Sequence, residues 1–431
     1  MPRTPAIAFI TLGCPKNEVD SDRMKAAVVA SAYTLVDEPL AADVIVLNTC
    51  AFIQEAAEEA IGEIMSLAEW KAERAGRRLL VAGCLPSRYE GELETEIPEV
   101  DAFVPVAEEQ ALLSVLERVT GVAANATDGP GRTIPASTAY VQISDGCDRR
   151  CAYCAIPSIR GPHVSRPLDD ILAEARFLID NGARELILVG QDTSAWGRDL
   201  SGRERLPELL GAVASLPGEF RVRVMYLQPD GVSDELLATM ATHDRVCRYL
   251  DVPVQHASRN VLKRMGRPGD YDSLLALVAR IRAAVPGVTL RTTIMSGFPG
   301  ETRADARALE RFVSAAAFDY TGVFAFSPED GTLAASMPDQ VPRRTRLARA
   351  QRLRDLADVV GASAAAARVG STVTVLIEGP EEDDMAVGRT CGQAPEIDGV
   401  TLFPPGPERG TFASVRIEDS DGYDLYGQVI V

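Results

Sequence analysis

The chain has 431 residues, and its 62 acidic side chains outnumber its 44 lysines and arginines, which gives a net charge of −18. This length is too great for one ordinary core and predicts two or three domains. No run of about 18 apolar residues occurs, which excludes a membrane-spanning helix, and the N-terminal residues lack a signal-peptide pattern. We therefore expect a cytoplasmic protein with no membrane partner. Its negative charge repels phosphate backbones, so nucleic-acid binding would require a local basic patch.

Residues 1–122 alternate short apolar strands with amphipathic helices, a pattern typical of an open parallel α/β sheet. The expected strands cover residues 6–13, 42–50 and 77–84, and the expected helices cover residues 21–32 and 54–76. Residues 123–138 are rich in Gly, Pro and small side chains and predict a linker.

Residues 139–367 continue the alternation with six further strand candidates, which predict a partial TIM-type (β/α) barrel with functional groups at the C-terminal ends of its strands. The candidates are residues 139–144, 185–193, 220–229, 248–255, 288–297 and 320–327, followed by a charged helix at 343–370. Residues 368–431 change to short alternating strands separated by Gly and Pro, which predicts a small all-β barrel of a kind often used for binding.

Three of the eight cysteines lie close together in "SDGCDRRCAYCAIPSIRG": Cys147, Cys151 and Cys154. Eight cysteines are too few for a disulfide scaffold in a chain of this size, so clustered ones suggest metal ligands or catalytic thiols. A structural zinc site would need a fourth ligand nearby. Three thiolates suit a cubane iron–sulfur cluster with one open iron. Zinc and simple core packing are the alternatives.

Cys14, Cys50 and Cys84 form a second set, each placed at the C-terminal end of an expected strand. Parallel strands one βαβ unit apart are usually neighbours, and their C-terminal ends open on one crevice. The three thiols could therefore converge, although buried core cysteines are the alternative. Cys247 and Cys391 fit neither set. We expect Cys247 to be a core residue and Cys391 to be a residue of the β domain.

The cysteine loop after the first barrel strand resembles that of the radical S-adenosylmethionine (SAM) superfamily. The resemblance implies a four-iron, four-sulfur cluster on Cys147, Cys151 and Cys154, with SAM on its open iron. It also implies cofactor-binding roles for Tyr153, which directly precedes the last cysteine of the loop, and for three residues at the ends of strands: Gly190, Gln191 and Gln255.

The segments "GCPKN", "NTCAFI" and "AGCLPSRY" are similar to the N-terminal domain of methylthiotransferases, and the C-terminal barrel resembles a TRAM domain. This resemblance implies a second four-iron, four-sulfur cluster on Cys14, Cys50 and Cys84. In the family that cluster delivers sulfur, and a methyl group from another SAM completes a methylthio group.

Within the family, "LGCPKNEVDSD" and "APEIDG" resemble the RimO type, which modifies the β-carbon of an aspartate in small-subunit ribosomal protein twelve. Residues 368–431 carry 12 acidic side chains, including Glu381–Asp384, against 4 arginines and no lysine. Such a domain suits a basic ribosomal protein better than RNA, so nucleic acid is not expected as the substrate. An electron donor such as flavodoxin or ferredoxin is the other expected partner. The alternatives are tRNA adenosine methylthiolation and a non-catalytic iron–sulfur carrier or RNA-binding adaptor.

Four arginines lie in or near the cysteine loop: Arg149, Arg150, Arg160 and Arg166. A guanidinium here could pair with the target aspartate or with the carboxylate of SAM. The alternative is that these side chains face solvent.

Overall fold

The computed structural model describes residues 4–127, 129, 131–380 and 385–430, so the acidic run Glu381–Asp384 lies outside the described residues. The chain divides into two compact units. Unit 1 comprises residues 1–134, 145–149 and 154–164, and unit 2 comprises residues 135–144, 150–153 and 165–431. The finer division at residues 122, 138 and 367 stays a prediction. No helix in the described part of the chain is long and apolar enough to cross a bilayer.

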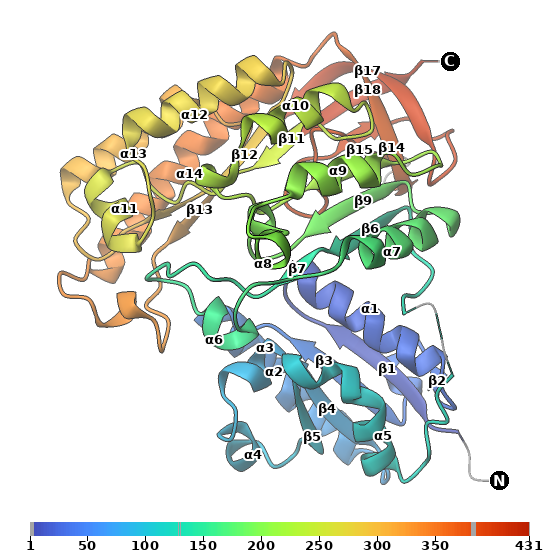
Figure 1. Ribbon diagram of the computed structural model, residues 1–431. Helices are drawn as coiled ribbons and strands as arrows, with labels where there is room; N and C mark the ends of the chain where they lie inside the picture. Colours follow the sequence, from blue (N-terminus) through green and yellow to red (C-terminus); the bar gives the residue numbers. More distant parts are fainter. Residues whose placement is uncertain (1–3, 128, 130, 381–384, 431) are drawn as a thin grey trace. The chain divides into compact units, whose positions relative to one another are not determined.

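Unit 1 is an α/β/α sandwich around a five-stranded parallel sheet in the order β2-β1-β3-β4-β5 (Figure 1). Its strands are β1 (Ala6–Thr11), β2 (Thr34–Leu35), β3 (Val44–Thr49), β4 (Arg78–Gly83) and β5 (Ala102–Pro105). Its helices are α1 (Pro15–Val29), η1 (Pro39–Ala41), α2 (Gln54–Ala72), α3 (Cys84–Arg88), α4 (Leu93–Glu96), η2 (Val106–Ala111), α5 (Leu112–Thr120) and α6 (Ile156–Arg160).

The sheet of unit 1 is buried on both faces, because its strands are apolar at consecutive positions. Val44 and Val46 of β3 belong to the core beneath α1 and α5. Ile45 and Leu47 point the opposite way, into the core beneath α2. Successive side chains of a strand alternate between faces, so a continuous apolar run predicts helices on both sides.

The three expected strands of this unit are confirmed, and the structure adds β2, β5 and α5. Helix α1 was expected at residues 21–32 but begins at Pro15, where proline suits the first helical position because no intrahelical partner is needed for its missing N–H. Described residues of the expected linker pack against the rest of unit 1. Ala124 is buried in the unit 1 core, and Arg132 pairs with Asp22 of α1.

Unit 2 begins with the six expected barrel strands, which form two parallel three-stranded sheets in the orders β10-β9-β6 and β11-β12-β13. The strands are β6 (Thr138–Gln142), β9 (Glu185–Val189), β10 (Arg221–Val224), β11 (Tyr249–Asp251), β12 (Thr289–Ser296) and β13 (Tyr320–Ala325). A bridge between Val222 and Val246 extends the first sheet toward β11. The result is the expected partial barrel.

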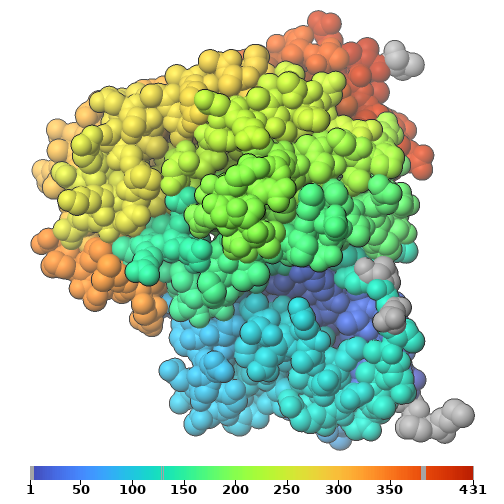
Figure 2. Space-filling view, in the orientation of Figure 1, coloured from blue at the N-terminus to red at the C-terminus, as the bar shows by residue number. Residues whose placement is uncertain are grey.

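Helices connect and cover these strands, and segments far apart in sequence pack closely in this unit (Figures 1 and 2). They are α7 (Leu168–Asp180), η3 (Thr193–Ala195), α8 (Arg198–Ser201), α9 (Leu206–Ala214), η4 (Pro229–Gly231), α10 (Asp234–Thr242), α11 (Arg259–Met265), α12 (Tyr271–Ala284), α13 (Arg303–Ala316), η5 (Leu333–Ser336) and α14 (Arg343–Ala366). Two short strands, β7 (Ser144–Asp145) and β8 (Val164–Ser165), flank the cysteine loop in sequence.

The C-terminal residues form the expected small barrel, closed by five strands in the order β14-β15-β16-β18-β17. The strands are β14 (Thr372–Pro380), β15 (Ala386–Thr390), β16 (Thr401–Phe403), β17 (Phe412–Asp421) and β18 (Asp424–Val429). β15 and β16 were not expected from the sequence.

This small barrel contacts the N-terminal ends of the large barrel's strands. Glu185, the first residue of β9, is fully buried and bonds Arg221 and Arg389 at 2.8 Å each. Arg223 also bonds Glu185 at 2.8 Å and donates to the carbonyl of Cys391 at 2.9 Å. Burial alone would raise the pKa of Glu185, but the three guanidiniums hold that pKa below its usual range. One carboxylate thus binds arginines from both barrels.

Replacing Glu185 by Gln should lower the free energy of unfolding by about 3–5 kcal/mol, because it leaves buried guanidiniums without their shared carboxylate. Urea unfolding followed by circular dichroism measures this change. Since the pKa of Glu185 is lowered by folding, its stabilisation should be complete above the ordinary value of 4.5 and should decline as the pH falls below it. Glu204→Gln is the control, because its pair with Arg198 is exposed and should contribute less than about 1 kcal/mol. Equal effects of the two substitutions would contradict the prediction.

Candidate functional site

The structure brings Cys14, Cys50 and Cys84 to one edge of the unit 1 sheet. Cys14 is the N-cap of α1 after β1, Cys50 follows β3 directly, and Cys84 is the first residue of α3 after β4. The three strands are adjacent, and the strand order reverses at β1 and β3. That reversal is where open α/β sheets form their ligand crevice.

A glycine allows two of these strand ends to approach. Gly13 has φ +102°, and a Cβ built on it would lie 2.5 Å from the Cβ of Cys50. Any other residue would both strain the backbone and displace Cys50. The close approach places Cys14, the next residue, beside Cys50.

Asn17, in the first turn of α1, contacts two of the three thiols. Its Oδ1 lies 3.4 Å from the Sγ of Cys14 and 4.0 Å from the Sγ of Cys84. Its Nδ2 donates to the carbonyl of Thr49 at 2.8 Å, so the fully buried side chain is fixed by the residue before Cys50. Sequence reasoning missed Asn17, although it belongs to the "GCPKN" segment.

Arg160 supplies a cation beside these thiols. Within unit 1, its Nη2 lies 3.7 Å from the Sγ of Cys84 and 2.8 Å from Asp20, and its Nη1 lies 3.2 Å from Asp145. Only 1% of the Arg160 side chain is exposed. Of the two readings of this arginine, solvent exposure is therefore wrong, and its carboxylate partners belong to the chain itself.

The electrostatics of the site favour neutral thiols. Burial raises the pKa of Cys84 to about 12, against the opposing charge of Arg160. Burial also raises the pKa of Cys50. A metal cluster on these cysteines would therefore have to displace their protons, which couples its binding to pH.

The donor set fits an iron–sulfur cluster. The three cysteines lie at adjacent strand ends, and polar groups of Asn17 and Arg160 lie near two of their sulfurs, as in sites where such contacts tune a cluster. No three His, Cys, Asp or Glu side chains among the described residues lie close enough to share a single metal ion. A four-iron cluster binds each thiolate through a different iron, so its ligands need not approach a common point.

The second cysteine set occupies a loop after β6 and β7. In unit 1, the backbone N–H of Arg149 donates to the Sγ of Cys147 at 3.4 Å. In unit 2, the Nη1 of Arg267 lies 3.9 Å from the Sγ of Cys151, and its Nη2 donates to the carbonyl of Pro253 at 2.7 Å. Arg267 is only 7% exposed, and nothing in its sequence context, "GRPGD", predicted this position.

Of the four residues expected to bind SAM, Tyr153 lies in the cysteine loop, and the other three follow strands of unit 2. Tyr153 packs against the large-barrel core, and Gly190 and Gln191 follow β9 directly. Gly190 has a packing reason to be glycine, because an added Cβ would lie 2.6 Å from the Oγ of Ser144. Gln255 has φ +66°, an uncommon backbone conformation often found at functional sites. Their contact with a cofactor stays a prediction.

The remaining loop arginines differ in their surroundings. Arg166 is in an ion pair with Glu174 at 2.6 Å and donates to the carbonyl of Gln142 at 2.7 Å, so it stabilises the fold. Arg150 is exposed.

The structure also places the two cysteines outside both sets. Cys247 is buried as expected but precedes β11 instead of lying in a strand, and Cys391 follows β15.

Comparison with known families and proteins agrees with this architecture. Residues 6–105 match the family described as "Uncharacterized protein family UPF0004", residues 141–313 match the Radical SAM superfamily, and residues 369–430 match the TRAM domain. Among solved structures, the radical SAM methyltransferase TsrM from Kitasatospora setae aligns with a TM-score of 0.56 at 15% identity, covering 75% of this chain and 72% of that chain. At that identity the likeness concerns the fold alone.

Curated relatives align over nearly the whole chain. The protein of Syntrophus aciditrophicus (strain SB) named ribosomal protein uS12 methylthiotransferase RimO is 43% identical, with 99% of each chain covered. Proteins of the same name from Pelotomaculum thermopropionicum and Geobacter sulfurreducens are 41% and 40% identical, covering 99% and 98% of each chain. The chain therefore belongs to the ribosomal protein uS12 methylthiotransferase RimO family of radical SAM proteins.

Proposed function

We propose that this protein adds a methylthio group to the β-carbon of an aspartate in ribosomal protein uS12, as a radical SAM methylthiotransferase. One observation carries the proposal: three cysteines lie at adjacent strand ends of unit 1, while a separate three-cysteine loop follows the first strand of the barrel. Asn17 contacts the thiols of Cys14 and Cys84 and the residue before Cys50. Two sets of three thiols provide for two clusters with different tasks.

Each cysteine set would hold one four-iron, four-sulfur cluster: Cys147, Cys151 and Cys154 the first, and Cys14, Cys50 and Cys84 the second. With SAM bound, the cluster on the loop cysteines would supply the radical chemistry that breaking an unactivated C–H bond requires. The cluster on the unit 1 cysteines would supply the sulfur. Tyr153, Gly190, Gln191 and Gln255 would bind SAM. Arg267 would place a positive charge beside Cys151. Arg160 would place one beside Cys84, where it opposes the rise in the pKa of that thiol caused by burial.

Charge supports a basic protein as the substrate. The C-terminal residues 368–431 hold 12 acidic side chains against 4 arginines. Arg389 and Arg368 are bound by acidic side chains of the chain itself. Among the described residues of this domain, five acids are exposed against two arginines: Glu396, Glu408, Glu418, Asp419 and Asp421 against Arg409 and Arg416. The exposed excess is therefore negative and complementary to a basic ribosomal protein. A flavodoxin or a ferredoxin would supply electrons.

Mass spectrometry of uS12 and of tRNA from cells with and without the gene tests the proposal. We expect uS12 to lose a modification of about 46 Da, one SCH3 group in place of hydrogen, when the gene is deleted. Loss from tRNA instead would establish tRNA methylthiolation. No loss from either, combined with no SAM cleavage by the reduced protein, would favour the non-catalytic carrier or adaptor.

Iron analysis tests the two cysteine sets. The anaerobically reconstituted protein should contain about eight irons per chain, and Cys14→Ala, Cys50→Ala or Cys84→Ala should lower this to about four. These variants should still cleave SAM but form no methylthio product. Cys391→Ala, which changes a thiol outside both sets, should keep the full iron content. Four irons in the unsubstituted protein would refute the second cluster.

Replacing Arg160 by Met should lower the stability of unit 1 by about 3–5 kcal/mol, because Asp20 is left buried without its cation. Adding Asp20→Asn should restore part of this loss in the same urea titration. Arg74→Met, which breaks the more exposed pair with Asp43, should cost less than about 1 kcal/mol. A double variant no more stable than Arg160→Met alone would show that the Asp20 pair is not the cause.

A further inference from the structure

A groove between α13 and α14 concentrates positive charge in this acidic protein. It is a hollow of about 520 Å³, and its charged lining consists of five arginines and one glutamate: Arg303, Arg307, Arg344, Arg349, Arg352 and Glu310. The chain as a whole carries a net charge of −18. The groove is therefore the kind of local basic patch that nucleic-acid binding by such a chain requires.

The arginines of the groove are only partly neutralised. Arg349 bonds Glu301 at 2.6 Å, and Arg352 lies 3.5 Å from Glu310. No carboxylate in the described part of the chain pairs with Arg303, Arg307 or Arg344, and all three side chains are exposed. Three guanidiniums with free donors remain available to a ligand.

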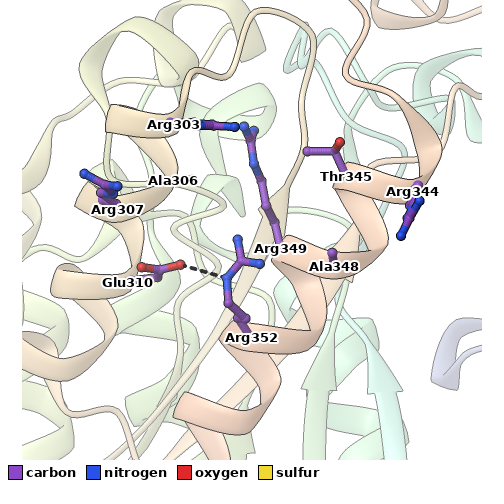
Figure 3. A pocket seen from close by; sticks show the side chains of 9 residues that line it. All are labelled: Arg303, Ala306, Arg307, Glu310, Arg344, Thr345, Ala348, Arg349 and Arg352. Atoms are coloured by element: carbon purple, nitrogen blue, oxygen red, sulfur yellow. Dashed lines mark hydrogen bonds and ion pairs between the residues drawn. The ribbon is translucent and has the colours of Figure 1, made fainter.

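The geometry brings like charges together. The guanidiniums of Arg303 and Arg349 lie side by side between the helices, and Arg307 and Arg344 lie on opposite sides of them (Figure 3). Neighbouring guanidiniums repel each other unless an anion lies between or beside them. An oxyanion that accepts several N–H donors at once, such as a phosphate, would relieve that repulsion.

The backbone adds to the positive potential. Arg303 is the first residue of α13, and Arg344 is the second residue of α14. The dipole of a helix favours anions at its N-terminus. α14 has no side-chain cap there, whereas the first turn of α13 already holds the carboxylate of Asp305 in a capping box. The contribution of the backbone therefore comes mainly from α14. These N-termini lie at the side of the barrel where the strands end, which is also the side of the cysteine loop in such a fold.

We propose that this groove binds the phosphate backbone of RNA. The choice of RNA among phosphate ligands rests on the proposed function, because a ribosomal protein is presented within an RNA-containing particle. An open row of arginines along two helices suits a chain of phosphates and carries no base-reading contact, so the binding is independent of sequence. Its role is to hold the particle while the substrate protein reaches the cluster side of the barrel.

Fluorescence anisotropy with a single-stranded RNA of about 20 nucleotides tests the groove on the reconstituted full chain. The triple variant Arg303→Gln, Arg307→Gln, Arg344→Gln should bind at least about tenfold more weakly at low salt and reduce the slope of log K against log salt by about 2. The matched control, Arg118→Gln, Arg176→Gln, Arg409→Gln, removes the same charge from exposed positions outside the groove and should bind like the unsubstituted chain.

Three results would overturn the inference: no RNA binding by the unsubstituted chain at low salt, equal weakening in both triple variants, or displacement of the RNA by millimolar inorganic phosphate, which would indicate a site for a small anion.

Comparing methylthiolation of two substrates separates this inference from the proposed function. The groove variant should methylthiolate free uS12 normally and assembled small subunits at least about tenfold more slowly at low enzyme concentration. An unsubstituted enzyme inactive on both would refute the proposed function while leaving the binding result intact.

Discussion

The ion pair between Arg160 and Asp20 is the constraint on which the arrangement of the cysteines depends. It fixes the segment after the cysteine loop against α1, so residues 154–164 belong to unit 1 although their neighbours in sequence belong to unit 2. A buried guanidinium is tolerable only where its donors are bonded, and Asp20, Asp145, Asn17 and Cys84 together meet that need. The charge that holds the backbone thus also lies beside the Cys84 thiol, where it opposes the rise in pKa that burial causes.

The sequence predicted those parts of the site that depend on local pattern. Apolar runs ending at Cys50 and Cys84 identified adjacent strands, since parallel strands place their C-terminal ends together. It could not identify Asn17, Arg160 or Arg267 as neighbours of sulfur, because each contact joins residues of separate elements through packing. Arg160 and Asp20 are 140 positions apart, and no periodicity encodes such a distance. For Arg160 the sequence left two readings; burial excludes solvent exposure, and the carboxylates that Arg160 binds are those of the chain itself.

The position of the C-terminal barrel bears on how a substrate could be held. Its contacts are with the first residues of the large barrel's strands: Thr138, Glu185, Arg221 and Tyr249. Functional groups of such barrels lie at the opposite ends of the strands. A strand of six residues spans about 20 Å, so an acidic domain at this end can hold a remote part of a basic protein but not the residue that reacts. Charge complementarity here would steer and orient the substrate.

The net charge of a chain this size does not decide which partners it binds. Helix α14 has Arg344 at its start and leads at its other end into the acidic barrel, and its 24 residues span about 36 Å. The Debye length at physiological salt is about 8 Å, so the two regions act almost independently in solution. The cationic groove can therefore attract phosphate although the whole chain is strongly negative, and the acidic barrel can attract a basic protein at the same time. An assembly of RNA and basic protein presents both charges, and a chain with separated patches of opposite sign recognises that combination better than either component alone.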